Sequence, residues 1–147
     1  MNLERYPFQS DINFQTYFFQ SEGPNGTINK IIVYSVFQEN PLIYNLAFGD
    51  EDPNTGGIND TAKSNNEDRD VVLATVASTI HLFSDHYGNQ LIYASGSTAA
   101  RTRLYQISIS KQLSEISTEF EVYGIINLEV LPFERNVNYD AFLVRRK

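Results

Sequence analysis

The chain has 147 residues, 41% of them hydrophobic, and no cysteine, so it is long enough for one packed domain and excludes disulfides, thiolate metal sites and cysteine nucleophiles. Its net charge of −7 and its scattered basic residues argue against a broad nucleic-acid surface, which needs a basic face. The sequence shows no signal-peptide pattern and no apolar run long enough to span a membrane, so we expect a cytoplasmic protein without membrane contact.

The first third of the chain predicts three strands. Residues 14–20, 28–38 and 42–48 are rich in β-branched and aromatic side chains. Clusters of Gly, Asn and Pro separate these segments, and such short connections favour antiparallel pairing.

A long polar segment follows, from residue 49 to residue 66. Loops of this length are uncommon inside compact domains and often carry function. Several of its side chains bear oxygen ligands of the kind that Ca²⁺ or Mg²⁺ prefers: Asp50, Asp52, Asn54, Asp60 and Asn66. Because the spacing lacks the rest of an EF-hand loop, we expect solvated side chains and no metal site.

Two helices are predicted in the second half of the chain. The segment Ser64–Glu67 has the form of a capping box, and the first helix is expected from about Glu67 to His86. Its apolar residues at helical spacing are Leu73, Val76, Ala77, Ile80 and Phe83. A second helix is expected from a cap at Ser97 or Thr98 to about Ser117. Its candidates for burial are Leu104, Ile107, Leu113 and Ile116.

Short apolar segments complete the predicted sheet. Residues 90–95 form a strand between the helices, residues 120–127 alternate like a strand, and residues 128–133 and 141–144 are two further candidates. The element order is β-β-β-α-β-α-β-β. We therefore expect a single α+β domain over residues 1–147, with a mostly antiparallel mixed sheet and two helices.

The strand-turn-helix junction at residues 96–103 is the strongest candidate for a site. A helix start exposes unpaired backbone amides and a partial positive charge, which suits an anion. Gly96 would let a ligand approach the backbone, and Ser97 and Thr98 add hydroxyl groups. Arg101 or Arg103 could clamp an oxyanion. The alternative is structural, because Ser and Thr cap many helices and arginines often pair with carboxylates.

Five runs together resemble an uncharacterised bacterial family of domains of unknown function: NLAFGD at 45–50, SNN at 64–66, LATVA at 73–77, GSTAARTRLY at 96–105 and NYDAF at 138–142. The resemblance implies no activity, because that family has none assigned. The element order is also similar to the core of the Gcn5-related N-acetyltransferase fold. That resemblance implies an acyl-CoA site in a glycine-rich loop before the first helix, where residues 63–70 are acidic instead.

Three hypotheses for function remain open, and the sequence decides neither whether the protein is an enzyme nor which residue would be catalytic. The first is a binding or accessory domain that takes a small, phosphate-bearing anion at residues 96–103 and needs no cofactor. The second is an acyl-CoA-dependent, acetyltransferase-like enzyme with Tyr105 or Tyr139 as general acid. The third is a protein-interaction module or homodimer that uses aromatic strand faces such as Tyr17, Phe19 and Tyr34.

Overall fold

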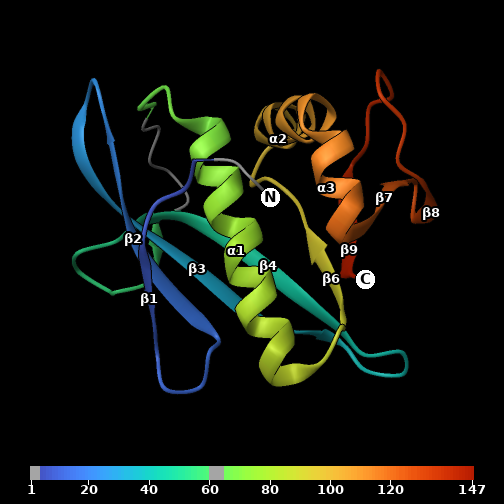
Figure 1. The fold of residues 1–147 in the computed structure, drawn as a ribbon, viewed down its shortest axis with the longest axis horizontal. Helices are drawn as coiled ribbons and strands as arrows, with labels where there is room; N and C mark the ends of the chain where they lie inside the picture. The colour runs from blue at the N-terminus through green and yellow to red at the C-terminus, as the bar shows by residue number, and fades with distance from the viewer. Residues whose placement is uncertain (1–3, 60–64) are drawn as a thin grey trace.

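A mixed β-sheet runs through the described part of the chain, with helices packed against it (Figure 1). The computed structural model describes residues 4–59 and 65–147. Its strands are β1 (Phe8–Ser10), β2 (Thr16–Gly23), β3 (Gly26–Gln38), β4 (Ile43–Glu51), β5 (Ile58–Asn59), β6 (Leu91–Ala94), β7 (Phe120–Ile126), β8 (Glu129–Pro132) and β9 (Ala141–Arg146). Its helices are α1 (Arg69–Tyr87), α2 (Ala99–Lys111) and α3 (Leu113–Glu119).

The strands follow the order β1-β2-β3-β4-β6-β9-β7-β8. In addition, β5 pairs with the C-terminal end of β4. All neighbours are antiparallel except β4 and β6, which pair in parallel. Two parallel neighbours need a crossover connection, and α1 supplies it. The expected α+β class with a mostly antiparallel mixed sheet is therefore confirmed. The strands β1 and β5 were not predicted, because three and two residues are too short to show an alternating pattern.

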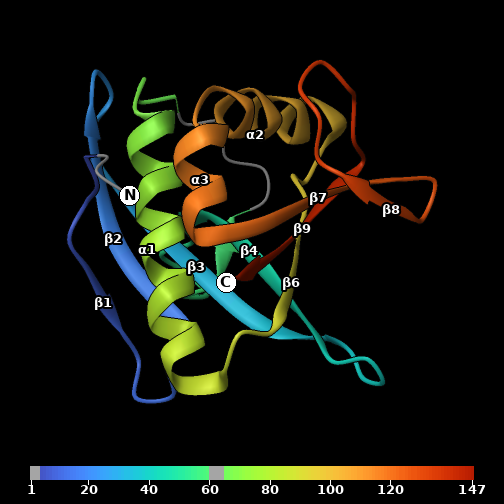
Figure 2. The same cartoon turned by 45° about the vertical axis from the view of Figure 1, so that its right-hand side comes forward.

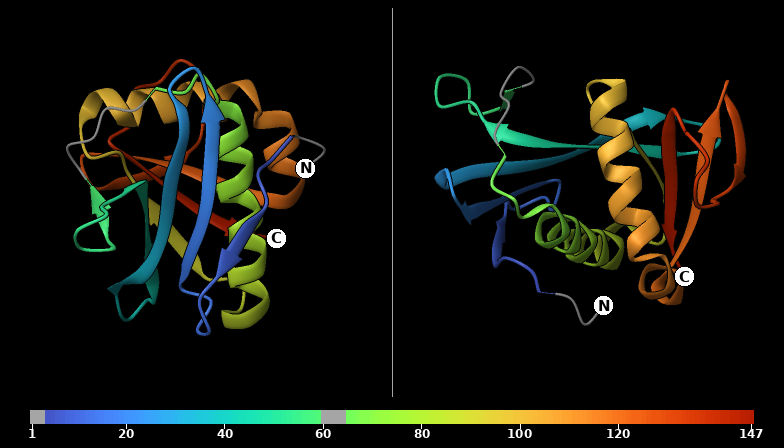
Figure 3. Two further views of the ribbon diagram at one scale, coloured as in Figure 1. Left: turned by 90° about the vertical axis from the view of Figure 1, so that its left-hand side faces the viewer. Right: turned by 90° about the horizontal axis from the view of Figure 1, so that it is seen from above.

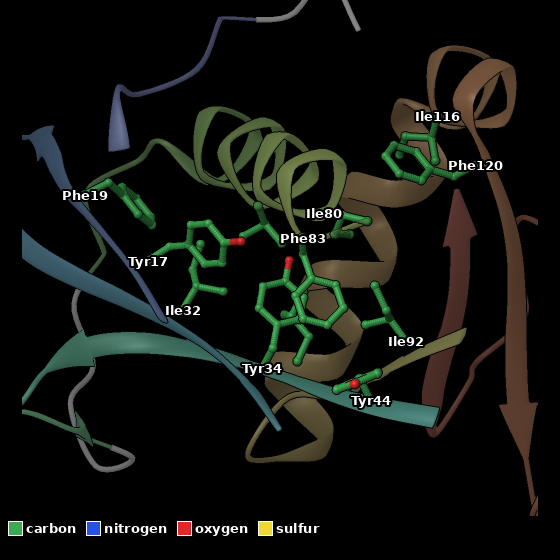
Figure 4. Close-up of a cluster of buried hydrophobic side chains, with 12 residues drawn as sticks. Tyr17, Phe19, Ile32, Tyr34, Tyr44, Ile80, Phe83, Ile92, Ile116 and Phe120 are labelled. Atoms are coloured by element: carbon green, nitrogen blue, oxygen red, sulfur yellow. The ribbon is translucent and has the colours of Figure 1, made fainter. Parts of the chain in front are cut away.

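The main core lies between α1 and the face of β2, β3 and β4 that α1 covers (Figure 3). On α1 the predicted residues Val76, Ile80 and Phe83 are buried. Figure 4 shows the ring of Phe83 against that of Tyr34, and their centroids lie 4.2 Å apart in a stacked arrangement. The Tyr34 hydroxyl lies 2.9 Å from that of Thr79, so the phenol has a hydrogen-bond partner inside the core.

The aromatic strand residues proposed for an interface belong to this core. Tyr17, Phe19 and Tyr34 are each at most 4% exposed and point toward α1 (Figure 4). The hypothesis that they form a docking face is wrong. Alternation along β2 and β3 does place them on one face, but that face is the one that α1 covers.

The first helix begins two residues later than expected. Asp68 is the N-cap of α1 and its side chain makes no cap hydrogen bond. Glu67 has φ +56°, so it cannot be part of the helix. The predicted capping box is therefore wrong, and Ser64 itself lies outside the described residues.

Contacts with the β2–β3 hairpin account for this late start. The Asp68 carboxylate accepts hydrogen bonds from the hydroxyls of Tyr6, at 2.6 Å, and Ser21, at 2.5 Å. The buried amide of Asn66 donates to Ser21 Oγ at 3.1 Å and to the Gly26 carbonyl at 2.9 Å. These side chains bind Tyr6 and the hairpin rather than the amides of α1, which holds Asn66 and Asp68 against the hairpin.

The predicted second helix is two helices. The chain leaves helical geometry at Gln112, and α3 then takes a different direction from α2 (Figure 2). Leu104 and Ile107, predicted to be buried, are each 43% exposed, whereas Ile116 of α3 is buried as expected. The buried side chains of α2 are polar: Thr102, Gln106 and Ser108. None of the helices within the described ranges is long and apolar enough to cross a membrane.

The core tyrosines predict a loss of stability at alkaline pH. Burial raises the pKa of Tyr17 and of Tyr34 well above the ordinary value of about 10. Above that value the unfolded chain loses these protons while the folded chain keeps them, so the free energy of unfolding falls as pH rises. Each such group contributes a slope of up to about 1.4 kcal/mol per pH unit.

We expect Tyr34→Phe to have a shallower alkaline decline than the parent protein, although it loses the Thr79 contact at pH 7. Urea unfolding between neutral and strongly alkaline pH measures both effects. Identical slopes for the variant and the parent above pH 10 would contradict the burial of this phenol.

Candidate functional site

A pocket of about 270 Å³ opens at the N-terminus of α2, where β6 ends. Figure 2 shows that the loop between β8 and β9 lies beside this end of the helix. The residues that line the pocket are Ser95, Gly96, Ser97, Thr98, Ala99, Thr102, Tyr139 and Asp140. Three of the five predicted site residues, Gly96, Ser97 and Thr98, are therefore together in its wall.

Thr98 caps α2, as predicted. Its backbone is extended, and its Oγ1 accepts a hydrogen bond from the backbone N–H of Arg101 at 3.1 Å. The first turn of α2 contains no acidic residue. No side chain of the first turn therefore neutralises the positive end of the helix dipole, and this end of the helix forms part of the pocket wall.

Gly96 allows the end of β6 to press against the first turn of α2. A Cβ at this position would lie 2.4 Å from the backbone nitrogen of Thr102. The Gly96 N–H in turn donates to Thr102 Oγ1 at 2.9 Å. The close approach that the sequence predicts at Gly96 is thus made by the protein's own helix.

The two arginines have different positions. Arg101 donates from its guanidinium to Ser97 Oγ at 2.7 Å, so its charge lies at the border of the pocket. Arg103 is exposed and does not line the pocket. Successive helical residues point about 100° apart, so residues two positions apart diverge widely. Neither arginine is among the residues that line the pocket, but Arg101 contacts one of them, Ser97.

Arg101 also lies within electrostatic range of Tyr105. Burial raises the pKa of the Tyr105 phenol, Arg101 opposes this rise, and Asp50 adds to it. Tyr105 does not line the pocket, and its ring contacts that of Phe48 with centroids 4.9 Å apart. Tyr139, the other candidate general acid, does line the pocket.

The second wall of the pocket is held by Gln106, a residue that the sequence reasoning did not select. Its buried amide accepts from the backbone N–H of Tyr139 at 3.1 Å and donates to the carbonyl of Val137. The Tyr139 hydroxyl accepts from the Glu134 N–H at 2.8 Å. These bonds fix the loop between β8 and β9 against α2 and set the position of the neighbouring Asp140.

Asp140, which follows Tyr139 in the β8–β9 loop, also lines the pocket. Its Oδ2 accepts from the backbone N–H of Asn127 at 3.0 Å. The pocket therefore combines a helix N-terminus and hydroxyl groups on one side with an acceptor on the other. This arrangement suits a ligand group that is anionic and also carries a hydrogen-bond donor.

The acidic segment gives no metal centre among the described residues. Asp50 forms an ion pair with Lys30, Asp52 accepts from the Asn54 N–H at 2.9 Å, and Asn66 is buried in the hairpin contacts above. Asp60 lies outside the described residues. Across residues 4–59 and 65–147, no group of three His, Asp or Glu side chains is placed to hold a metal ion.

One family model matches almost the whole chain, over residues 2–147, and its description is "Family of unknown function (DUF6934)". The chain belongs to this family. The predicted resemblance to a family of unknown function is thus confirmed, and membership of the DUF6934 family brings no activity with it. Neither the curated proteins nor the solved structures contain a match to the chain.

The role of Gln106 predicts the effect of removing its amide. Gln106→Leu leaves the Tyr139 N–H and the Val137 carbonyl without their partner, so we expect the free energy of unfolding to fall by about 2–4 kcal/mol. Gln20→Leu on the exposed face of β2 is the control, with an expected change within about 0.5 kcal/mol. Urea unfolding measures both variants.

Hydrogen exchange separates this role from a general loss of stability. In Gln106→Leu the Tyr139 amide should exchange faster relative to the amides of β3 than it does in the parent. Unchanged relative protection of Tyr139 would show that Gln106 does not hold the pocket wall.

Proposed function

We propose that this DUF6934 protein is a small binding domain that takes an anionic, phosphate-bearing ligand in the pocket at the start of α2. The observation that carries the proposal is the composition of one pocket wall. The positive end of α2 and the hydroxyls of Ser97 and Thr98 lie in that wall, and the guanidinium of Arg101 binds Ser97 beside it. Each of these groups stabilises negative charge, and together they lie at the edge of one cavity.

Asp140 narrows the class of ligand. A carboxylate repels a fully deprotonated anion but accepts a hydrogen bond from one that keeps a proton. Monohydrogen phosphate and phosphate esters with neighbouring hydroxyls carry such a donor, whereas sulfate at neutral pH does not. The pocket therefore favours a phosphate group over a sulfate group of the same size.

Titration calorimetry with inorganic phosphate and adenosine monophosphate tests the site. We expect Arg101→Ala to weaken binding about tenfold or more, because a charge-assisted hydrogen bond is lost. Arg103→Ala is the matched control, since it removes the same charge from the same helix on the side away from Ser97. Equal affinities for the two variants would contradict the assignment of the site.

A comparison of phosphate with sulfate tests the role of Asp140. The parent protein should bind phosphate about tenfold more tightly than sulfate, and Asp140→Asn should narrow this difference by admitting sulfate. If the parent bound phosphate and sulfate with equal affinity, Asp140 would have no role in choosing between the two anions.

The acyl-CoA alternative finds less support at the start of α1. The carboxylate of Asp68 occupies the N-cap position there, and Asp70 lies in the first turn. These charges oppose a pyrophosphate group at the positive end of that helix. A rise in melting temperature with excess acetyl-CoA that survives Arg101→Ala would favour the acetyltransferase-like reading over the pocket on α2.

A further inference from the structure

The helix α2 buries three polar side chains and exposes two of its large aliphatic ones. On the inner side, Thr102 binds the Gly96 N–H, Gln106 binds the β8–β9 loop, and Ser108 Oγ accepts from Arg69 Nε at 3.0 Å. Leu104 and Ile107 point outward and are each 43% exposed. A surface helix ordinarily has the reverse arrangement, with its apolar stripe toward the core.

The outward residues form one continuous stripe. At about 100° per residue, five positions of α2 lie on the same side of the helix: Ala100, Arg103, Leu104, Ile107 and Lys111. All five are exposed. The stripe places two branched aliphatic side chains in the centre and a basic residue toward each end.

The charge of this stripe contrasts with that of the whole chain. The protein carries a net charge of −7, yet α2 contains two arginines, one lysine and no acidic residue. Lys111 forms an ion pair with Asp70 of α1, with its Nζ 2.6 Å from Asp70 Oδ2. Arg103 therefore supplies most of the positive charge beside Leu104. A basic, apolar surface on an acidic protein is complementary to a partner with acidic and apolar side chains.

We propose that this stripe is a docking surface for an acidic amphipathic helical segment of another protein. The partner's apolar residues would cover Leu104 and Ile107, and its carboxylates would pair with Arg103. A second copy of this chain is the poorer occupant, because a twofold contact through α2 brings Arg103 close to its own symmetry mate. The stripe is small, so the contact is a weak and transient one.

This docking surface is independent of the proposed anion pocket. Arg101 borders the pocket and Arg103 belongs to the stripe, on different sides of the same helix. Arg101→Ala should therefore leave docking unchanged, and substitutions in the stripe should leave phosphate binding unchanged. Failure of one proposal is thus distinguishable from failure of the other.

Fluorescence anisotropy with a labelled, designed helical peptide tests the docking surface. The probe has leucines on one helical face and glutamates on both flanks, and control probes have the same composition scrambled or lysine in place of glutamate. We expect the full-length protein to bind the acidic amphipathic probe, with affinity that falls as salt rises, and to bind both control probes at least tenfold more weakly.

Variants of the protein locate the contact. Leu104→Ser combined with Ile107→Ser, and separately Arg103→Glu, should each weaken binding of the acidic probe at least tenfold. Val130→Ser is the matched control, because Val130 is an exposed aliphatic residue on β8, away from α2. Circular dichroism establishes that each variant is folded.

Two results would overturn the proposal. One is equal binding of the acidic probe and its scrambled control, or equal binding by the parent and the Leu104/Ile107 double variant. The other is a dimer in sedimentation experiments that the double variant dissociates, since the surface would then belong to a second copy of this chain.

Discussion

The buried amide of Gln106 joins elements that are far apart in the sequence. It binds the backbone of the β8–β9 loop through Val137 and Tyr139, while Thr102, one helical turn earlier, binds the backbone at Gly96. Backbone groups enclosed in this way need hydrogen-bond partners, so the inner face of α2 has to be polar. The pocket exists because these bonds hold its two walls on the same helix, and Leu104 and Ile107 remain on the outside.

The starts of α1 and α2 differ in the charge that lies at each N-cap. Asp68 fills the N-cap of α1, where Tyr6 and Ser21 donate to its carboxylate. At α2 the cap is the neutral Thr98, and the charge beside it is the guanidinium of Arg101. The two N-caps differ because the segments before the two helices have different structural roles. The first anchors the chain to the β2–β3 hairpin, and the second closes one wall of a cavity.

Much of the fold was predictable because it follows hydrophobic periodicity. The strands from β2 to β4 and the buried side of α1 show regular periods, and the expected elements match them. The same rule failed on α2, where it selected Leu104 and Ile107 for burial. It assumes that a helix meets apolar side chains, whereas Thr102 and Gln106 on the inner face of α2 meet backbone amides and carbonyls. The Thr98 cap was predictable because its partner lies three residues away, but the partners of Gln106 lie more than thirty residues later, where no local pattern connects them.

The orientation of α2 underlies both the pocket and the proposed docking surface, and thiol labelling measures that orientation directly. The chain contains no cysteine, so a single introduced thiol reports its own accessibility. The structure predicts that Leu104→Cys and Ile107→Cys react with a maleimide about as fast as an exposed control at Val130, and that Thr102→Cys and Gln106→Cys react at least a hundredfold more slowly. Fast labelling at positions 102 and 106 with protection at 104 and 107 would contradict this account of the helix.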